Sequence, residues 1–205
     1  MDEWEKRGAG YLYNAVLDQE IVDKRLACAD LCFALNSCRP SDIPKQQGFL
    51  KQILGRIGGY VVIRLPFWCD YGCNISLGDH FFSRGNLMIL DAAPVTFGSH
   101  VFVGPNCVFT TAGHPIDRIH REQGLEVARP ITVGNSVWIG ASVTVLPGVE
   151  IGDTSIIGAG SVVTKSIPAG VIAFGNPCRV VRRITEADRN RYPVYVPGAE
   201  EGGAG

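Results

Sequence analysis

The sequence predicts an all-β protein whose main body is a parallel β-solenoid, preceded by an α-helical cap. Between Ile131 and Ile167, large aliphatic residues recur every six positions: Val133, Ile139, Val145, Ile151, Ile157 and Val163. A second series of aliphatic or small residues stands two places before each of them. No α-helix keeps a period of six on one face. A coil with short flat sides does so, with three such repeats per turn if its section is triangular.

An earlier tract keeps the same step. Phe97, Val103 and Phe109 follow one another at the same interval of six, and the distance from Phe109 to Val133 is a whole number of repeats. The register therefore survives whatever lies between them. The distance from Leu77 to Phe97 exceeds a whole number of repeats by two positions, which predicts a small bulge or loop. An antiparallel sandwich would instead show two-residue alternation and irregular spacing.

The segment 1–58 predicts two amphipathic helices. Apolar residues recur three to five apart in the first, with Asp18, Asp23 and Lys24 on the outer face; they are Leu17, Ile21, Val22, Leu26, Leu31 and Leu35. The second is expected to follow Pro40-Ser41-Asp42 and to end at Gly58-Gly59, with the stripe Phe49, Leu50, Ile53, Leu54 and Ile57. Cys28 and Cys32 share a helix face. Because no second pair stands at ligand spacing, core packing is favoured over a metal site.

We therefore divide the chain into a helical cap at 1–58, a coil at 59–184 with an excursion loop at 110–130, and a C-terminal tail at 185–205. Histidines, arginines and acidic residues interrupt the repeat in the excursion, and a loop that leaves a regular wall is a typical place for a site. The tail is rich in Gly, Pro and Glu, and we expect it to be mobile beyond about Pro197.

Composition excludes several classes. The 205 residues are 46% hydrophobic, enough for one substantial domain. The formal net charge of -1 argues against nucleic acid or an anionic membrane as a partner. No stretch is long and apolar enough for a membrane span, and the polar start predicts no signal peptide. Seven cysteines, an odd number, form no obvious disulfide framework, so a reducing cytoplasm is expected.

Several runs carry a resemblance to a known family. Together with the six-residue repeats, they resemble the maltose/galactoside O-acetyltransferase family of hexapeptide-repeat enzymes, over roughly residues 5 to 184; the runs are Cys69-Asp70-Tyr71-Gly72, 111–117 (TAGHPID), 135–140 (NSVWIG) and 175–179 (GNPCR). The resemblance implies a left-handed β-helix, although the usual crossover preference is right-handed. It also implies acetyl transfer from acetyl-CoA to a sugar hydroxyl, and a homotrimer with one active site at each interface.

His114 is the expected catalytic residue, because an imidazole can take a proton from a sugar hydroxyl near neutral pH. The resemblance implies that His114 is a general base in a direct reaction without an acetyl-enzyme. Glu126 aligns with a family position beside this histidine and is expected to orient it; a solvated loop carboxylate is the alternative. By the same resemblance, Ala141 contacts the developing oxyanion.

The resemblance also assigns the acetyl-CoA site. Trp138 lies in a region that lines the cofactor channel in the family, although ordinary packing at a subunit contact would explain it equally well. The other matched positions are Ala159, Thr164 and Lys165 along the following coils, and Arg179 and Arg182, whose guanidinium groups suit the nucleotide phosphates.

The match is weaker at the acceptor site. Asp70 and Asn86 fit the polar lining of the family, and Arg25 matches a basic residue of the cap. Three positions depart from the family pattern: Arg84 stands where many relatives have asparagine, Ala92 replaces a second aspartate after Asp91, and Ala15 replaces an acceptor-binding aspartate. Asp91 is assigned to the acceptor site in compensation, and the identity of the sugar stays open.

Two other functions fit the same coil. A γ-class carbonic anhydrase needs three histidines around a shared metal; His80, His114 and His120 could be assigned to it, but the spacing from 114 to 120 does not match, and we predict no metal site. A non-catalytic assembly protein is compatible with Arg84 and Ala15. The intact His114 argues against it.

Overall fold

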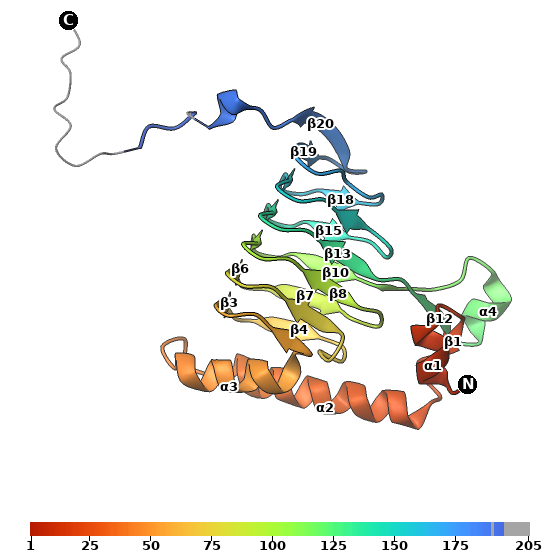
Figure 1. Cartoon of the computed structure of the whole chain (residues 1–205). Coiled ribbons are helices and arrows are strands. Elements are labelled where there is room, and N and C mark those ends of the chain that lie inside the picture. Colours follow the sequence, from red (N-terminus) through yellow and green to blue (C-terminus); the bar gives the residue numbers. More distant parts are fainter. Residues whose placement is uncertain (190, 195–205) are drawn as a thin grey trace, which may run out of the picture.

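The computed structural model describes residues 1–189 and 191–194, so the expected mobile segment beyond Pro197 lies outside the described residues. Its main body is a parallel β-solenoid whose successive turns stack on one another, with helices closing one end (Figure 1). Within the described part of the chain, no helix is long and apolar enough to cross a membrane.

Three sheets form the walls of the coil, and the chain visits them in the same order on every turn. Wall 1 comprises β2 (Arg56–Ile57), β5 (Ile75–Leu77), β8 (Val95–Phe97), β13 (Ile131–Val133) and β16 (Glu150–Ile151). Wall 2 comprises β3 (Val61–Ile63), β6 (Phe81–Ser83), β9 (Phe102–Val103), β14 (Trp138–Ile139), β17 (Ile156–Ile157), β19 (Val171–Phe174) and the antiparallel β20 (Arg179–Arg183). Wall 3 comprises β4 (Phe67–Cys69), β7 (Leu87–Leu90), β10 (Val108–Thr110), β15 (Thr144–Val145) and β18 (Val162–Val163).

Both predicted series point into the coil and form its core. Val133, Ile139 and Val145 are at most 1% exposed, and the serines of the second series, Ser155 and Ser161, are 0% exposed. The Ser155 hydroxyl donates to the Pro168 carbonyl at 2.8 Å, which satisfies a polar group that burial would otherwise penalise. The backbones stack closely at the corners: a Cβ on Gly140 would lie 2.6 Å from the nitrogen of Ala159, one turn further on.

Pairing between turns explains the irregular spacing. Val133 pairs with Ile151, which is the third following member of the same series, so a regular turn holds three repeats. Leu77 pairs with Phe97, and this turn is longer than three repeats by two positions. The extra positions lie in the bend at 91–94 between β7 and β8, as the predicted bulge requires. Phe97 pairs with Val133 across the excursion, so the register is preserved.

Three helices form the cap: α1 (Glu3–Gly8), α2 (Gln19–Asn36) and α3 (Ile43–Ile53). The first of these was not predicted. The predicted end of the last helix was wrong, because Leu54 is extended and Ile57 pairs with Leu77 in the first turn of the coil. Two residues predicted for the apolar stripe of the first expected helix are exposed instead: Leu17, which precedes α2, is 81% exposed, and Leu26 is 59% exposed.

The buried stripe of α2 instead consists of Ile21, Cys28, Cys32 and Leu35. These residues are separated by seven, four and three positions, so they lie on one helical face, and Leu26 falls outside it. Cys28 and Cys32 are thus buried in the core, as the sequence predicted.

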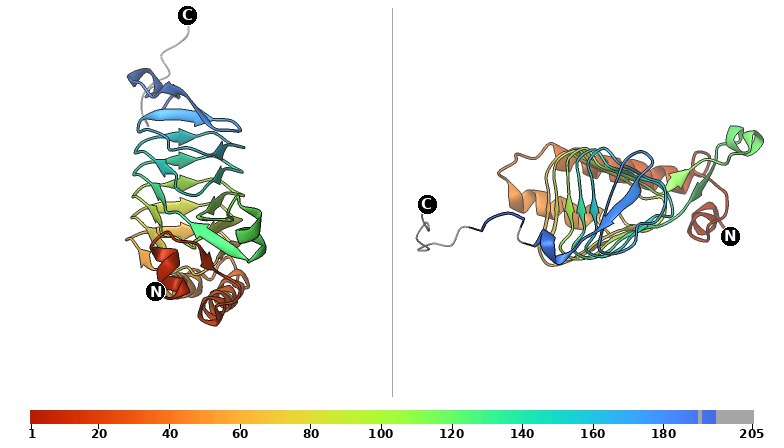
Figure 2. Two further views of the ribbon diagram at one scale, coloured as in Figure 1. Left: turned by 90° about the vertical axis from the view of Figure 1, so that its right-hand side faces the viewer. Right: turned by 90° about the horizontal axis from the view of Figure 1, so that it is seen from above.

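The excursion is an ordered arm. Strands β11 (Ala112–Gly113) and β12 (Leu125–Ala128) pair antiparallel, α4 (Arg118–Glu122) lies between them, and β1 (Tyr13–Asn14) adds to the free side of β12. Figure 2 shows this arm reaching out beyond one edge of the coil, beside the N-terminal segment. A short 3-10 helix, η1 (Glu186–Asp188), follows β20.

Candidate active site

The additions to the regular coil all fall at one edge, where the chain passes from wall 3 to wall 1. We call it the insertion edge; it comprises residues 70–74, 91–94, 111–130, 146–149 and 164–166. The edge between wall 2 and wall 3 contains only short connections without added residues, and we call it the plain edge. It comprises residues 64–66, 84–86, 104–107, 140–143 and 158–161. The predicted site residues are divided between these two edges.

His114 follows β11 on the insertion edge, and its side chain is exposed in the single chain. Its Nδ1 lies 3.1 Å from the carbonyl oxygen of Leu125 on the facing strand. A carbonyl can only accept, so this contact assigns the proton to Nδ1 and leaves Nε2 with a free lone pair. The two antiparallel strands of the arm therefore fix the ring in the tautomer that a general base needs.

Glu126 does not make the contact that the sequence suggested. Its carboxylate accepts a hydrogen bond from the hydroxyl of Tyr13 at 2.8 Å, and no hydrogen bond joins it to His114 within the described residues. Tyr13 is 0% exposed, and burial followed by the nearby Glu126 charge raises the pKa of its phenol. The backbone of Leu125 thus orients the histidine, while Tyr13 holds Glu126 beside it.

Asp70 and Arg25 lie close enough to influence each other. Burial, followed by the charge of Asp91, raises the pKa of Asp70 to about 6, and Arg25 opposes that rise. The Arg25 guanidinium donates to the carbonyl of Ala15 at 3.3 Å. A half-buried carboxyl and a cation from the cap thus share the floor of the insertion edge, as expected for the lining of a polar acceptor site.

Asp91 has a different place from the one predicted. It is 0% exposed, and its carboxylate accepts backbone N–H bonds from Asp70, Tyr71 and Asn74 at 3.1, 2.9 and 3.3 Å. These bonds hold the preceding bend of the insertion edge. We therefore correct its assignment from acceptor contact to support of the bend that presents Asp70.

Arg84 and Asn86 lie on the plain edge, away from Asp70. Arg84 lines an open groove of about 660 Å³ together with Phe82, Phe102, Pro105, Trp138 and Ala141. Asn86 donates through its amide to Asn106 on the next turn at 2.9 Å. The structure thus places these two residues on the same edge as Trp138 and Ala141, two of the predicted cofactor residues.

The predicted acetyl-CoA residues are themselves divided. Trp138 and Ala141 line the plain-edge groove, and Ala159 lies one turn further along, where Gly160 donates to the carbonyl of Ala141 at 2.8 Å. Thr164 and Lys165 are exposed on the insertion edge after β18. Arg179 and Arg182 stand on β20, beyond the last turn.

Arg182 is already engaged. Its guanidinium makes two hydrogen bonds of 2.7 Å to the carboxylate of Asp188 in η1, which raises the pKa of Arg182 and lowers that of Asp188. An exposed ion pair of this kind is weak, so a phosphate could compete with Asp188 for the same guanidinium.

Comparisons with known proteins agree with this architecture. Residues 6–58 match the family model described as "Maltose acetyltransferase hexapeptide capping motif", and residues 130–165 match "Bacterial transferase hexapeptide (six repeats)". Galactoside O-acetyltransferase of Escherichia coli (strain K12) is 39% identical over 188 residues, 92% of each chain. The chain belongs to the maltose and galactoside O-acetyltransferase family.

Solved structures of this family have the same fold. The crystal structure of a maltose O-acetyltransferase from Clostridium difficile 630 is 40% identical, with a TM-score of 0.89 over 91% of this chain and 99% of that one. A galactoside acetyltransferase in complex with coenzyme A is 39% identical, with a TM-score of 0.90 over 95% of this chain and 96% of that one. The predicted left-handed β-helix with a helical cap is therefore confirmed.

The family also disfavours the carbonic-anhydrase alternative, and the geometry agrees. His80 stacks on His100 at 4.7 Å at the edge between walls 1 and 2, and His120 lies in α4 beside Asp117. Among the described residues, only one group of three or more potential metal-ligand side chains lies close enough to share an ion, and it contains no histidine. The three histidines do not meet in this chain.

Sequence reasoning missed two residues that pack against the insertion edge. Tyr13 is buried against Glu126, and Arg7 is 5% exposed, donates to the carbonyl of Ala92 and lies 3.5 Å from the ring centre of Trp4. Both come from the segment 1–14, whose elements are too short for periodicity to reveal. The only indication in the sequence was that Tyr13 and Arg7 are an aromatic residue and an arginine close to the N-terminus, ahead of a polar turn.

Proposed function

We propose that this chain transfers the acetyl group of acetyl-CoA to a hydroxyl of a sugar or glycoside. The observation that carries the proposal is His114, whose Nδ1 faces the Leu125 carbonyl at 3.1 Å so that Nε2 is left free to accept a proton. Relatives of the same family are named as galactoside and maltose O-acetyltransferases, and one binds coenzyme A. These names support a sugar hydroxyl as the acceptor.

In the proposed reaction, Nε2 of His114 takes the proton of the acceptor hydroxyl while the oxygen attacks the thioester carbonyl carbon. The carbonyl π electrons move onto oxygen, and the N–H of Ala141 donates to the resulting oxyanion. The intermediate then expels the coenzyme A sulfur, and the imidazolium returns its proton to that thiolate. No acetyl-enzyme forms, so both substrates must be bound together.

Coenzyme A is proposed to lie along the plain-edge groove. Trp138 and Ala141 would contact the pantetheine arm, with Ala159 on the next turn and Arg179 and Arg182 at the phosphates. Thr164 and Lys165 would approach the arm from the insertion edge of a neighbouring subunit. The groove is apolar where Phe82, Phe102 and Trp138 line it and basic at Arg84. Apolar walls suit the arm, and guanidinium groups suit phosphates.

The active site is proposed to form between subunits of a homotrimer. His114 and Ala141 stand on different edges of one chain, so a reacting thioester can reach both only if a second chain supplies one of them. The outer faces of the walls support this arrangement. The outward ladder of wall 2 is apolar, with Phe102 52% exposed and Trp138 53% exposed.

The outward faces of the other two walls differ in polarity. Wall 3 presents Trp68, Met88 and Val108 outward, whereas wall 1 presents a polar row: Arg56, Ser76, Thr96, Thr132 and Glu150. A closed trimer covers two walls of each subunit and leaves the third in water. Solution scattering should therefore give the mass of three chains, and the mass of one chain would contradict the arrangement.

The acceptor is proposed to lie on the insertion edge, over Asp70 and Arg25. A carboxyl and a guanidinium offer the hydrogen bonds that a polyol needs. Arg84 and Asn86 of a neighbouring subunit would approach the same acceptor from the plain edge.

All seven cysteines are free, which supports a reducing compartment such as the cytoplasm.

The proposal is tested by coenzyme A release from acetyl-CoA across maltose, glucose, galactosides and amino sugars. Release is expected with one sugar class, and His114→Ala should lower kcat by about 10²–10⁴-fold, the usual contribution of a general base. His120→Ala, in the same arm, is the matched control and should keep full activity. No release with any hydroxyl acceptor, or an unchanged rate in His114→Ala, would contradict the proposal.

A further inference from the structure

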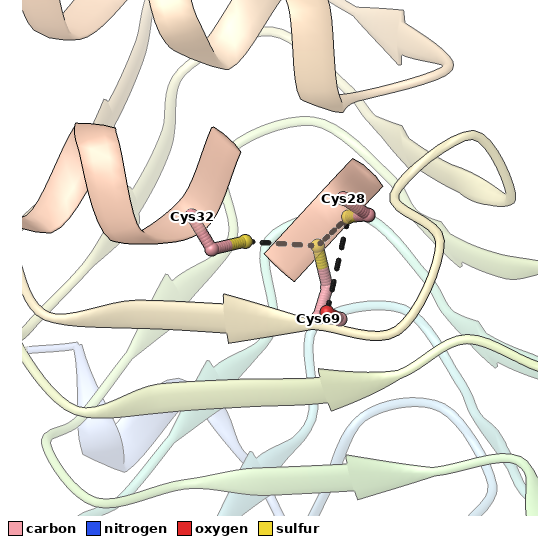
Figure 3. A group of neighbouring side chains, drawn as sticks. All are labelled: Cys28, Cys32 and Cys69. Carbon is pink, nitrogen blue, oxygen red and sulfur yellow. Dashed lines mark hydrogen bonds between the residues drawn. The ribbon is translucent and has the colours of Figure 1, made fainter. Parts of the chain in front are cut away.

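Three cysteines meet where the cap rests on the coil, outside both edges of the proposed active site. Cys28 and Cys32 lie one turn apart on α2, and Cys69 is the last residue of β4 (Figure 3). The Sγ of Cys69 is 3.5 Å from that of Cys28 and 3.7 Å from that of Cys32. The three residues are 4%, 0% and 8% exposed.

The geometry of the cluster suits a central ion. The three sulfurs all lie within 4.8 Å of one another. An ion bonded to three sulfurs at about 2.3 Å each, in one plane with them, requires sulfur–sulfur separations of about 4.0 Å. The two observed separations differ from that value by a few tenths of an ångström, which rotation about the cysteine side-chain bonds can supply.

The donor set selects the ion. Thiolate sulfur is a soft donor, and the cluster holds no imidazole or carboxylate. Zinc in a closed site takes four ligands, and the described residues place no fourth ligand atom within the group. A soft monovalent ion that accepts three sulfur ligands, copper(I), fits the set better.

We propose that Cys28, Cys32 and Cys69 form a buried copper(I) site that joins α2 to the first turn of the coil. Binding displaces one proton for each thiol that becomes a thiolate and transfers no electron. The helix and the strand are then linked through the ion.

The surroundings make thiolate formation possible in a buried place. The three thiols contact one another, with the Sγ of Cys69 3.5 Å from that of Cys28 and 3.7 Å from that of Cys32, so neighbouring S–H groups can stabilise a thiolate by hydrogen bonding. The single positive charge of copper(I) offsets the charge of one thiolate in the core.

An entry path leads to the cluster from the surface. A pocket of about 360 Å³ is lined by Cys28, Lys24, Trp4 and Tyr71, and by the exposed Cys73. Cys73 lies outside the cluster but lines the same pocket as Cys28, so the pocket offers a sulfur ligand on the way from the surface to the cluster.

Two other states of the cluster are outcomes of the test. The first is a Cys28–Cys69 disulfide, which would need an oxidant to remove two electrons and would shorten the 3.5 Å separation to about 2.05 Å. The second is three reduced thiols that serve only as core packing. Either state would overturn the proposal.

The test titrates the full-length chain, reduced and free of oxygen, with copper(I) in competition with a chromophoric copper(I) chelator. We expect one ion per chain. Each of Cys28→Ser, Cys32→Ser and Cys69→Ser should bind about 100-fold more weakly. Cys38→Ser, a buried cysteine outside the cluster, and Cys73→Ser, at the pocket mouth, are the matched controls and should retain wild-type affinity at equilibrium.

X-ray absorption on the copper-loaded wild type gives a readout that does not depend on whether a variant folds. Three sulfur neighbours at about 2.3 Å are expected. Nitrogen or oxygen neighbours, a loss of binding in Cys73→Ser, or no binding that competes with the chelator would overturn the proposal. So would a mass two protons lighter in the chain purified without reductant, which would show the disulfide.

Discussion

Between Ile131 and Val163 the chain advances through regular turns, and Val133 pairs with Ile151 after three whole repeats. At the insertion edge the same coil takes in extra residues on three successive turns, in the bends at 70–74 and 91–94 and in the arm at 111–130. The regular turns are held by apolar residues and small buried serines, whereas the insertion edge contains the buried Asp91 and packs against the buried Arg7 and Tyr13 of the N-terminal segment. Repetition therefore builds the walls, and local departures from it build the edge at which we propose the acceptor site.

The two regions also satisfy their polar groups differently. In the regular turns, backbone bonds between neighbouring turns account for most of the pairing, as when Gly134 donates to Ile151 at 2.8 Å. At the insertion edge, side chains replace those bonds, since Asp91 accepts the N–H groups of an irregular bend. The edge should thus be sensitive to the loss of single polar groups, and the regular turns to the loss of volume.

The largest effect on stability is expected in the core of the coil. Phe97 is 2% exposed and packs edge-to-face on Phe81 and Phe109 at 5.1 and 5.0 Å between ring centres. Phe97→Ala should lower the free energy of unfolding by about 3–5 kcal/mol, measured by urea denaturation. Thr96→Ala, which faces outward from the same strand, should change it by less than about 0.5 kcal/mol. Equal effects would contradict the inward and outward assignment.

A smaller effect is expected at Asp91. Asp91→Ala leaves the N–H groups of Asp70 and Tyr71 buried without an acceptor, so the free energy of unfolding should fall by about 2–3 kcal/mol. Because the bend presents Asp70, KM for the sugar should rise with it. Asp153→Ala, which removes a carboxylate that accepts from Asn135 at 2.6 Å on an exposed corner, is the comparison and should cost less. A stable Asp91→Ala variant with unchanged KM would show that Asp91 does not support the bend that presents Asp70.

The next prediction concerns the hydrogen bond by which Tyr13 holds Glu126 in place. Tyr13→Phe removes only the hydroxyl that donates to Glu126 at 2.8 Å, and should lower kcat/KM about tenfold if Glu126 must be held in place. Glu126→Gln should have a similar effect, and the double variant should add little to either, because both changes break one contact. Fully additive losses would show that the two side chains act separately. Tyr11→Phe, on an exposed tyrosine nearby, is the control.

The smallest effect is expected at the far end of the coil. Arg182 holds the Asp188 carboxylate and lowers its pKa, so this pair contributes stability above the usual carboxyl pKa and loses it as pH falls through the lowered value. Because the pair is exposed, that contribution is small. Asp188→Asn frees the guanidinium and should tighten coenzyme A binding a few-fold in calorimetry. Weaker binding would show that Asp188 positions Arg182 for the phosphates.

The periodic part of the fold could be predicted because a coil repeats one requirement many times. Val133, Ile139 and Val145 occupy equivalent places, and each supports the same interpretation. The end of α3 could not be predicted in this way, since Ile57 fits a helical stripe and a β ladder equally well. Only pairing with Leu77 decides between them.

The candidate site was less predictable, for a different reason. His114 and Glu126 were found together by resemblance, but the partner of each lies elsewhere: Leu125 through its backbone, and Tyr13 from the far N-terminal segment. Asp91 carries no local mark that it faces inward. Cys28 and Cys32 were visible as a pair, but the nearness of Cys69 follows from how the cap packs on the coil.

In the proposed trimer, each active site combines the insertion edge of one subunit with the plain edge of another. This arrangement is tested most directly by unfolding and refolding together two inactive variants, His114→Ala and Ala141→Trp, the second of which blocks the plain-edge groove. Activity should return in the mixed trimers, because roughly a quarter of their interfaces carry two intact halves. If each variant folds but the mixture stays as inactive as its components, both edges must act within one chain, and the account is wrong.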